Sequence, residues 1–560
     1  MATRRILLIG GTGVFGQRLA RHVATVDGLA LTLTSRDADK ARAVAAEISA
    51  GGARQPVDGI ALDHRTGFDA TLANLKPWLV IDASGPFQGA SYAVPLTALI
   101  SGAHVIDLAD ARDYLAGYEA ALDATARAAG LTAIAGASST PALSAAAVAA
   151  LTHGWQRIDT IDIAITPGGQ SDVGRAVIEA ILSYAGQPVP IWRDGCLSRA
   201  DGWIESRRVT VPGLGSRRVA LVETADAERL GPRHRVQSRV AFYAGLESRI
   251  EQSGLMALAR LRRRGWIGGL TPLIPVLLAA RRVTQRLTSD RGGMLVSVTG
   301  LDARGDACST QWSLLAEHGD GPYVPVLPAA AAVRALLADG FETGAHVGTG
   351  PLPLAAIEAE MKPYAITTAR QVKPRTGSVF ATALGAETFA ALPARVRTFH
   401  SSQATPVWTG WADIDAGTGF LARLIGWVIG LPRSGRDLLV TVTVDRPLGD
   451  ASAPLEEIWT RNFAGQRFSS RLSAAGLGAM TETFGPIALT LQPSANRDGL
   501  SLPVAGWRVA GVAMPRWLAP RSQAREFTGA DGRFHFDVEI SLPLVGRLVH
   551  YRGWLSERPH

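Results

Sequence analysis

A glycine-rich turn between an apolar run and a helix-patterned segment constrains the fold of this chain most. Residues 6–9 are apolar, as in a buried parallel strand, and residues 17–24 have helical spacing. Between them Gly11, Gly13 and Gly16 fit the spacing G-x-G-x-x-G. In a strand–turn–helix unit such glycines permit a tight turn, close approach of a pyrophosphate and close helix packing. The start of the helix then offers N–H groups to the phosphates. We therefore expect a dinucleotide at this turn.

Further strand-like and helix-like segments alternate over the first 150 residues. The expected strands are residues 29–34, 60–63, 78–81, 105–108 and 131–135, and the clearest helices are residues 90–100 and 114–129. Alternation of this kind predicts a doubly wound parallel sheet, the Rossmann arrangement, over residues 1–150.

The end of the second expected strand indicates which dinucleotide binds. An Asp or Glu usually stands there to accept a hydrogen bond from the ribose 2′-hydroxyl of NAD. Here the strand ends in Ser35 and Arg36, and Arg36 lies 20 residues after Gly16. An arginine can pair with a 2′-phosphate, and Lys40 adds charge one turn later. The pattern favours NADP over NAD, against the alternative of an exposed arginine at a helix start. The expected cofactor contacts are Gly10, Gly11, Thr12, Gly13, Val14, Phe15, Gly16, Ser35, Arg36, Lys40, Asp63, Ala83, Ser84, Gly85 and Pro86.

Four sequence blocks together resemble a known family. They are GGTGVFG, VIDASGPFQG, SGAHVIDLAD and AGASSTPALS, and they resemble the saccharopine-dehydrogenase-like NADP-binding oxidoreductases. The resemblance covers about residues 1–150 and continues more faintly to about residue 365. It implies an NADP-dependent dehydrogenase or reductase that transfers hydride to a small or lipid-like substrate. It also implies that residues 151–366 form an α/β substrate domain with a mixed sheet.

Catalytic side chains are harder to identify, because hydride transfer needs geometry and a proton source more than one special residue. Asp107, Asp110 and Ser138, with Ser139 beside them, are the candidates near the expected cleft. The alternative for each is a structural role, because polar residues at strand ends commonly cap the next helix. Residues 168–171 (GGQS), before a helix expected over 173–184, either hold an anionic substrate group or form an ordinary turn. The arginines available for a substrate carboxylate are Arg175, Arg207, Arg208 and Arg217.

Charge and composition exclude some partners. The net charge is +8 and the pI about 9.8, yet lysine is rare and no nucleic-acid-binding motif accompanies the arginines. We expect no nucleic-acid partner. Two cysteines form no metal or disulfide pattern, and the N-terminus lacks a signal-peptide pattern, so we expect a cytoplasmic protein. Residues 265–280 are apolar but too short to span a bilayer, which needs about 20 residues. Arginines flank them, so residues 260–282 form either a buried helix or a peripheral membrane contact.

Beyond a polar linker expected at residues 367–378, the character changes. Residues 379–560 resemble an uncharacterised domain family found in bacteria behind saccharopine-dehydrogenase-like domains. Strand-like runs such as residues 438–444 and 534–542 predict a β-rich domain, with an amphipathic or buried helix at 421–431. His400, His535 and His550 fit no metal spacing, and we expect no metal site. An antiparallel sheet around a cavity would suit an apolar ligand, and a purely structural domain is an equal alternative.

Three other functions stay open from the sequence alone. The chain could be a non-catalytic NADP-binding sensor, a membrane-peripheral lipid-binding fusion protein, or an epimerase that uses bound NADP without net redox chemistry. A homo-oligomer is compatible with all of them.

Overall fold

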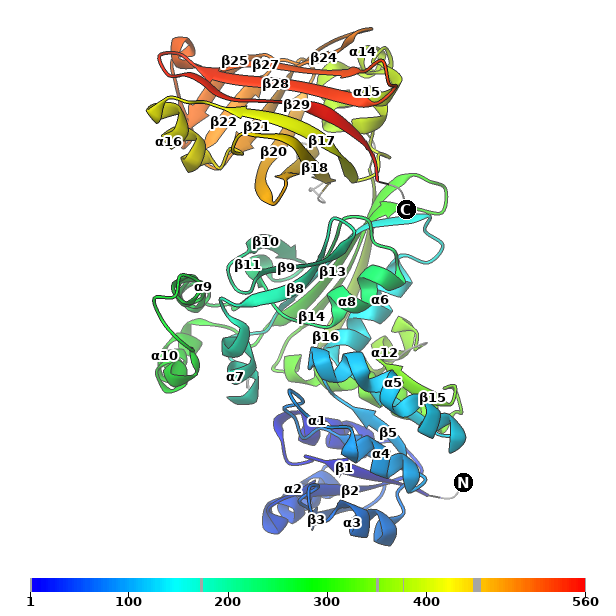
Figure 1. Ribbon diagram of the computed structural model, residues 1–560. Helices are drawn as coiled ribbons and strands as arrows, with labels where there is room; N and C mark the ends of the chain where they lie inside the picture. Colours follow the sequence, from blue (N-terminus) through cyan, green and yellow to red (C-terminus); the bar gives the residue numbers. More distant parts are fainter. Residues whose placement is uncertain (1–2, 172–174, 349–351, 376, 447–454, 559–560) are drawn as a thin grey trace.

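Three sheets follow one another along the molecule in the computed structural model, which describes residues 3–171, 175–348, 352–375, 377–446 and 455–558 (Figure 1). The first is parallel, the second is mixed and the third is antiparallel. The predicted fold class, a Rossmann domain, a mixed-sheet domain and a β-rich C-terminal domain, is confirmed by these sheets.

The first sheet has the strand order β15-β6-β5-β4-β1-β2-β3. Its strands are β1 (Arg4–Ile9), β2 (Leu29–Ser35), β3 (Val57–Ala61), β4 (Leu79–Asp82), β5 (His104–Asp107), β6 (Thr132–Ala135) and β15 (Gly344–Val347). One face carries α1 (Val14–Val23), α2 (Ala38–Ala50) and α11 (Leu327–Leu337); the other carries α3 (Phe68–Leu75), α4 (Ala93–Ile100) and α5 (Arg112–Ala128). Side chains of β1 alternate between the two cores, so Ile6 and Leu8 pack on one face and Leu7 and Ile9 on the other. The strand order reverses between β1 and β4, where open α/β sheets bind their ligands.

A segment much later in the sequence completes this sheet. β15 pairs in parallel with β6, and α11 packs near α1, although in the sequence both lie between the strands β14 and β16 of the second sheet. Neither segment is predicted from the sequence to join this sheet, because a four-residue strand gives little periodic signal.

The second sheet has the order β10-β11-β12-β7-β13-β14-β16, with a hairpin of β8 and β9 attached to β12. Its strands are β7 (Arg157–Thr166), β8 (Pro188–Arg193), β9 (Cys196–Asp201), β10 (Ser206–Val211), β11 (Gly215–Leu221), β12 (Arg239–Ala244), β13 (Gly292–Leu301), β14 (Ala307–Ala316) and β16 (Ile366–Pro374). The helices are α6 (Ser144–Leu151), α7 (Arg175–Tyr184), α8 (Asp226–Arg233), α9 (Arg249–Arg263), α10 (Ile274–Thr284) and α12 (Leu354–Met361). The predicted start of α7 at residue 173 lies outside the described residues.

Residues 366–374 correct the expected linker, because they form β16 and pair with β14 along its whole length. The segment looks like a linker because β16 is an edge strand whose middle residues are exposed and polar. A strand with two solvated faces lacks the apolar alternation on which sequence reasoning depends.

The third sheet has thirteen strands in the order β23-β24-β27-β28-β29-β17-β18-β19-β20-β21-β22-β25-β26. Its strands are β17 (Val407–Ala416), β18 (Gly435–Asp445), β19 (Leu455–Phe463), β20 (Gln466–Gly476), β21 (Ala479–Phe484), β22 (Ile487–Leu491), β23 (Ser494–Asn496), β24 (Gly499–Ser501), β25 (Val504–Val509), β26 (Val512–Ala513), β27 (Arg521–Thr528), β28 (Phe534–Leu542) and β29 (Gly546–Glu557). Its helices are α13 (Val379–Leu384), α14 (Ala386–Ala390), α15 (Ala394–Phe399) and α16 (Phe420–Ile429). Figure 1 shows α14 and α15 at one end of the sheet and α16 at the other.

Buried ion pairs join the second and third sheets. Asp445 at the end of β18 accepts hydrogen bonds from Arg239 and from the Ser238 hydroxyl, whose oxygen lies 2.8 Å away. Arg239 also binds Asp162 on β7. On the neighbouring hairpin, Asp194 accepts hydrogen bonds from Thr443 and Arg467. The C-terminal sheet is therefore held against the second sheet by charged groups that are largely removed from water.

Candidate nucleotide and substrate site

The glycine turn packs directly against the segment that follows β4. Gly10 has φ +72°, and a Cβ there would lie 2.8 Å from the Cα of Ser84. A Cβ on Gly16 would lie 2.2 Å from the carbonyl oxygen of Gly10. Backbone atoms occupy both positions, so a side chain at either would force the turn apart. The turn, β1 and the start of α1 thus form one tightly packed unit.

The N-terminus of α1 is open to an anion. Gly13 is the N-cap residue, it is exposed, and no side chain caps the first turn. No acidic residue stands in that turn either. Helix N–H groups without a side-chain partner attract phosphate. Thr12, Val14 and Phe15 around them are partly buried. This cradle fits the pyrophosphate of a dinucleotide.

The carboxyl ends of β2 and β3 lie next to each other beyond the turn. Ser35 ends β2, and its backbone carbonyl accepts a hydrogen bond from Leu62 N–H just after β3. Arg36 and Lys40 are exposed there, and so is Asp63, whose carboxylate accepts the N–H of Arg65. The structure therefore brings the residues expected at the adenosine end to one edge of the sheet.

After β4 the chain forms a short shelf beside the turn. Buried Asp82 accepts hydrogen bonds from the backbone N–H and the hydroxyl of Ser84, at 2.9 and 2.6 Å. Ala83 and Ser84 are partly buried, while Gly85 and Pro86 are exposed. Asp82 thus fixes the segment expected near the nicotinamide ribose.

Asp107 connects the ends of β5 and β6. Its carboxylate accepts the N–H groups of Ala109 and Gly136, at 3.0 and 2.8 Å, and the hydroxyl of Tyr114 at 3.2 Å. Burial raises the pKa of Asp107 to about 7, and these hydrogen bonds oppose that shift. All of these partners belong to the protein, so Asp107 has the geometry of a structural anchor.

The other predicted catalytic residues lie nearby. The Asp110 side chain is accessible, and desolvation by the surrounding protein raises its pKa. Ser138 is partly buried, and its carbonyl accepts the N–H of Leu143. Ser139 is buried at the start of the next helical turn.

A large apolar cavity begins at the glycine turn and extends into the second domain. Its volume is about 620 Å³, and Phe15 and Ser139 stand in its wall. Further lining residues come from α7, α9, α10, the strands β7, β13 and β14, the loops beside them, and the 3-10 turn Gly321–Val326. Most lining side chains are aliphatic, such as Ile178, Leu255 and Met294. The polar lining residues among those described are Ser139, Ser171, Glu251, Arg281 and Thr284.

Protein groups engage the charged residues of this wall. Arg281 donates to the backbone carbonyls of Gly169 and Ser171, both at 3.0 Å, and Thr284 donates to Glu251. The N–H of Gly169 donates to Glu247 at 2.9 Å. The 168–171 turn, expected either to hold an anion or to form an ordinary turn, therefore binds a carboxylate of the chain itself.

Three of the arginines proposed for a substrate carboxylate, Arg207, Arg208 and Arg217, are absent from the described wall. Arg207 pairs with Asp162 at 2.7 Å, and Arg217 pairs with Glu247 at 3.3 Å. Arg208 is exposed on β10, and the side chain of Arg175 lies outside the described residues. The described wall of the cavity thus offers a substrate mainly apolar contacts.

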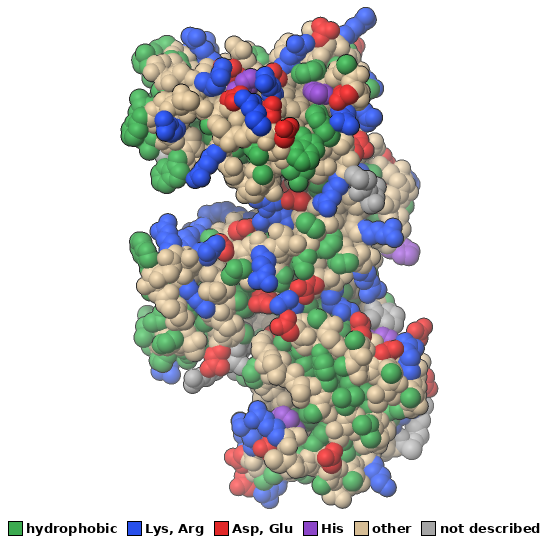
Figure 2. All heavy atoms as spheres, viewed as in Figure 1, with side chains coloured by type: hydrophobic (Ala, Val, Ile, Leu, Met, Phe, Trp, Pro, Cys, Tyr) green, Lys and Arg blue, Asp and Glu red, His purple; other side chains and the backbone are tan. Residues whose placement is uncertain are grey.

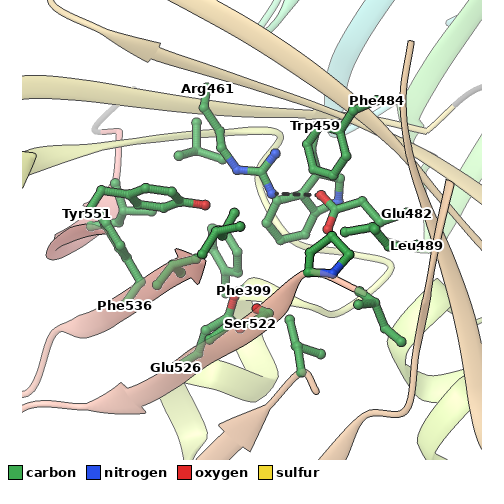
Figure 3. Close-up of a pocket in the computed structure, with 18 of the residues that line it drawn as sticks. Phe399, Trp459, Arg461, Glu482, Phe484, Leu489, Ser522, Glu526, Phe536 and Tyr551 are labelled. Atoms are coloured by element: carbon green, nitrogen blue, oxygen red, sulfur yellow. Dashed lines mark hydrogen bonds and ion pairs between the residues drawn. The ribbon is translucent and has the colours of Figure 1, made fainter. Parts of the chain in front are cut away.

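A second, smaller cavity of about 80 Å³ lies inside the C-terminal sheet (Figure 3). Arg461 and Glu482 form an ion pair in its wall at 3.3 Å, and the Arg461 guanidinium lies 5.2 Å from the Trp459 ring centroid. Figure 3 shows Tyr551 on the facing side, where burial raises its pKa to about 12. Among the described residues, no group of three His, Cys, Asp or Glu side chains could hold a metal ion. No helix of the described chain is both long and apolar enough to cross a bilayer.

Comparison with known proteins finds one matching family model and several solved structures of similar fold. The model of a domain of unknown function, DUF4166, matches residues 392–555. No curated protein matches the chain. The apo saccharopine dehydrogenase (L-Glu forming) of Saccharomyces cerevisiae is similar over 66% of this chain and 100% of its own, at 14% identity and a TM-score of 0.49.

Other solved structures are similar at lower scores. The DAP dehydrogenase of C. glutamicum, in complex with DAP, covers 65% of this chain and 99% of its own, at 12% identity and a TM-score of 0.35. An engineered D-amino acid dehydrogenase bound to NADP+ covers 64% and 96%, at 13% identity and a TM-score of 0.34. The two resemblances predicted from the sequence thus recur, but likenesses this distant bring no activity or substrate to the chain.

Sequence reasoning missed most of the cavity. Its wall comes from helices and strands far apart in the chain, and single aliphatic residues such as Leu255 or Met294 look like ordinary core residues. The one available signal was the apolar run at 265–280, part of which becomes α10.

Proposed function

We propose that this chain is an NADP-dependent oxidoreductase that acts on an apolar, lipid-like substrate. One observation carries the proposal: Phe15, in the first turn of α1, and Ser139, after β6, stand in the wall of the same apolar cavity. A substrate in the cavity therefore lies beside the point where the strand order of the first sheet reverses, which is where such sheets bind nucleotides.

The residues present fit a dinucleotide. Gly10 and Gly16 allow the turn its close packing, and the uncapped start of α1 at Gly13 offers N–H groups to the pyrophosphate. The exposed Arg36 and Lys40 at the end of β2 would bind a 2′-phosphate, which favours NADP over NAD. A bound nicotinamide would donate or accept the hydride.

The cavity wall favours a substrate without charged groups. A buried carboxylate or ammonium group needs a charged partner, because desolvation strongly disfavours an unpaired charge. Arg281 is held by two backbone carbonyls, and Glu251 is held by Thr284. The described part of the wall therefore offers an amino-acid substrate of the saccharopine type no unengaged charged partner. Aliphatic side chains instead favour a hydrocarbon chain.

Ser139 is the predicted catalytic candidate that reaches this cavity; Asp107, Asp110 and Ser138 are absent from its described wall. We propose that the Ser139 hydroxyl positions the reacting polar group of the substrate by a hydrogen bond. Asp107 acts by holding the loops after β5 and β6 in place.

Oxidation of NADPH tests the proposal. A series of carbonyl and enoyl compounds with lengthening alkyl chains should give kcat/KM values that rise with chain length, whereas short 2-oxo acids should be poor substrates. Ala257 lines the cavity on the exposed side of α9, so Ala257→Trp should fill the space and lower kcat/KM by about tenfold or more.

The matched control is Ala279→Trp, at an exposed position of α10 that does not line the cavity. It should leave kcat/KM unchanged. Turnover of short 2-oxo acids in preference to alkyl substrates would refute the substrate class. Absence of turnover despite NADPH binding would favour the non-catalytic sensor instead.

The membrane contact expected for residues 260–282 also stays a proposal. Trp266 is 70% exposed and Val276 is 65% exposed, so this segment is not a fully buried helix. Cytoplasmic localisation and a homo-oligomeric state stay predictions of the sequence, as do the domain boundaries other than the linker that β16 replaces.

A further inference from the structure

The helix α16 of the C-terminal domain exposes its apolar face. Phe420 is 79% exposed and Trp427 is 77% exposed, and Leu421 and Leu424 are exposed beside them. Phe420, Leu424 and Trp427 follow the spacing i, i+4, i+7 along one side of the helix. The opposite side, at Ala422 and Gly426, is buried. A surface helix of a protein that meets only water shows the reverse pattern, with polar residues outward.

The pair α9–α10, taken with the loop that joins them and the 3-10 turn Gln285–Leu287, carries a second exposed apolar surface. Besides Trp266 and Val276, Val283 is 70% exposed and Leu287 is 84% exposed. The neighbouring side of α10, at Leu277 and Thr284, lines the large cavity. One helix thus separates the cavity from an apolar outer surface.

The two surfaces lie on the same side of the molecule. Figure 1 places α16, α9 and α10 together along its left edge, although they belong to different domains. Figure 2, in the same view, shows hydrophobic side chains along that edge in both regions. Because both elements are outermost in one direction, a single flat surface can touch both.

The two segments that carry these surfaces are rich in arginine and poor in acidic residues. The sequence from Gln252 to Ser289 contains no Asp or Glu. The exposed arginines in that stretch include Arg260, Arg264, Arg282 and Arg286. The guanidinium of Arg264 lies 5.6 Å from the ring centroid of Trp266.

The segment that carries α16 also lacks acidic residues. Residues 416–436 contain no Asp or Glu, and Arg423 and Arg433 are exposed. Tryptophan beside arginine, around an apolar centre, is the composition of surfaces that enter the headgroup region of anionic lipid. Two copies of the chain joined through these faces would instead bring arginines against arginines, which disfavours a dimer as the occupant.

We propose that α16 and the α9–α10 pair together form a docking surface for an anionic lipid bilayer, with one apolar insertion point on each domain. The surface goes beyond the proposed function, since docking needs no nucleotide. If the proposed function holds, docking places the α10 wall of the cavity at the bilayer, where a lipid-like substrate is concentrated.

Co-sedimentation of the full chain with vesicles tests this surface. The vesicles are phosphatidylcholine alone or phosphatidylcholine mixed with phosphatidylglycerol. The wild type should bind the mixed vesicles, and binding should weaken as salt is added because the headgroup attraction is screened. The α16 variant Phe420→Ser/Trp427→Ser and the α9–α10 variant Trp266→Ser/Val283→Ser should each lower the partition coefficient about tenfold or more.

Ile100→Ser is the matched control, because Ile100 is 76% exposed but belongs to α4 of the first domain. It should bind like the wild type, and all variants should keep the wild-type unfolding temperature within a few degrees, about what exposed substitutions cause. Wild type that does not bind the mixed vesicles overturns the proposal. An α16 variant that binds fully overturns the two-point surface. A wild-type dimer that either variant converts to a monomer assigns these faces to a second copy and also overturns it. Failure of NADPH turnover would refute the proposed function and leave the vesicle result unaffected.

Discussion

The substitution Gly13→Ala should weaken nucleotide binding and leave the free energy of unfolding nearly unchanged. The N-cap residue Gly13 has φ −79°, which any residue adopts. A Cβ there would meet the Gly10 oxygen at 3.2 Å, a contact relieved by a shift of a few tenths of an ångström. Loss of N-cap preference and loss of unfolded-chain entropy oppose each other, so Gly13→Ala should change the free energy of unfolding by less than about 1 kcal/mol.

The same methyl group stands where a pyrophosphate would approach the uncapped start of α1. Displacing one charge-assisted hydrogen bond costs roughly 1.5–3 kcal/mol. Since about 1.4 kcal/mol corresponds to a factor of ten in Kd, NADPH affinity should fall about ten- to a hundredfold. Isothermal titration measures the affinity, and urea denaturation measures the stability.

Gly16→Ala provides the contrast. Its Cβ would lie 2.2 Å from the Gly10 carbonyl oxygen, within the backbone of the turn itself. We expect it to lower the free energy of unfolding by about 1–3 kcal/mol, as overpacking does. If Gly13→Ala bound NADPH as tightly as the wild type, the nucleotide would not lie across the start of α1, and the reasoning would be refuted.

Two further predictions concern buried carboxylates. Burial raises the pKa of Asp107 from 3.8 to about 7. Between these two pH values the carboxyl group is protonated in the folded state and ionised in the unfolded chain. The free energy of unfolding therefore falls as the pH rises through this range. Asp107→Asn should therefore gain stability relative to the wild type between about pH 4 and pH 7, measured by urea denaturation; a constant difference would contradict the shift. Asp445→Asn should destabilise the protein by about 1–3 kcal/mol, because it removes a buried charge bound to Arg239, while Asp415→Asn, in an exposed pair with Arg436, should cost less than about 0.5 kcal/mol. Equal losses in thermal unfolding for the two variants would argue against the buried contact.

The sequence predicts the first sheet well for a physical reason. Its strands are continuous apolar runs separated by helices, and the glycine turn fixes where the first helix begins. The exposed edge strand β16 and the short strand β15 carry no such pattern, so their pairing follows only from the assembled sheet.

The candidate site also has one part that the sequence predicts and one part that it does not. Its nucleotide half is local in the sequence, because β1, the turn and α1 are consecutive. Its cavity half combines Phe15, Ser139 and α9–α10, which only the fold brings together. The outward apolar face of α16 was predicted as an amphipathic or buried helix, since spacing shows that one side differs but not which side meets water.

Titration of the wild type and of Arg36→Ala with NADPH and with NADH tests whether this chain binds NADP at the glycine turn. We expect wild type to bind NADPH more tightly than NADH. Arg36→Ala should lose about ten- to a hundredfold in NADPH affinity, as expected for one charge-assisted contact to the 2′-phosphate, and keep its NADH affinity. Wild type that binds neither nucleotide would contradict the account, and equal affinity for both would contradict the assignment to NADP.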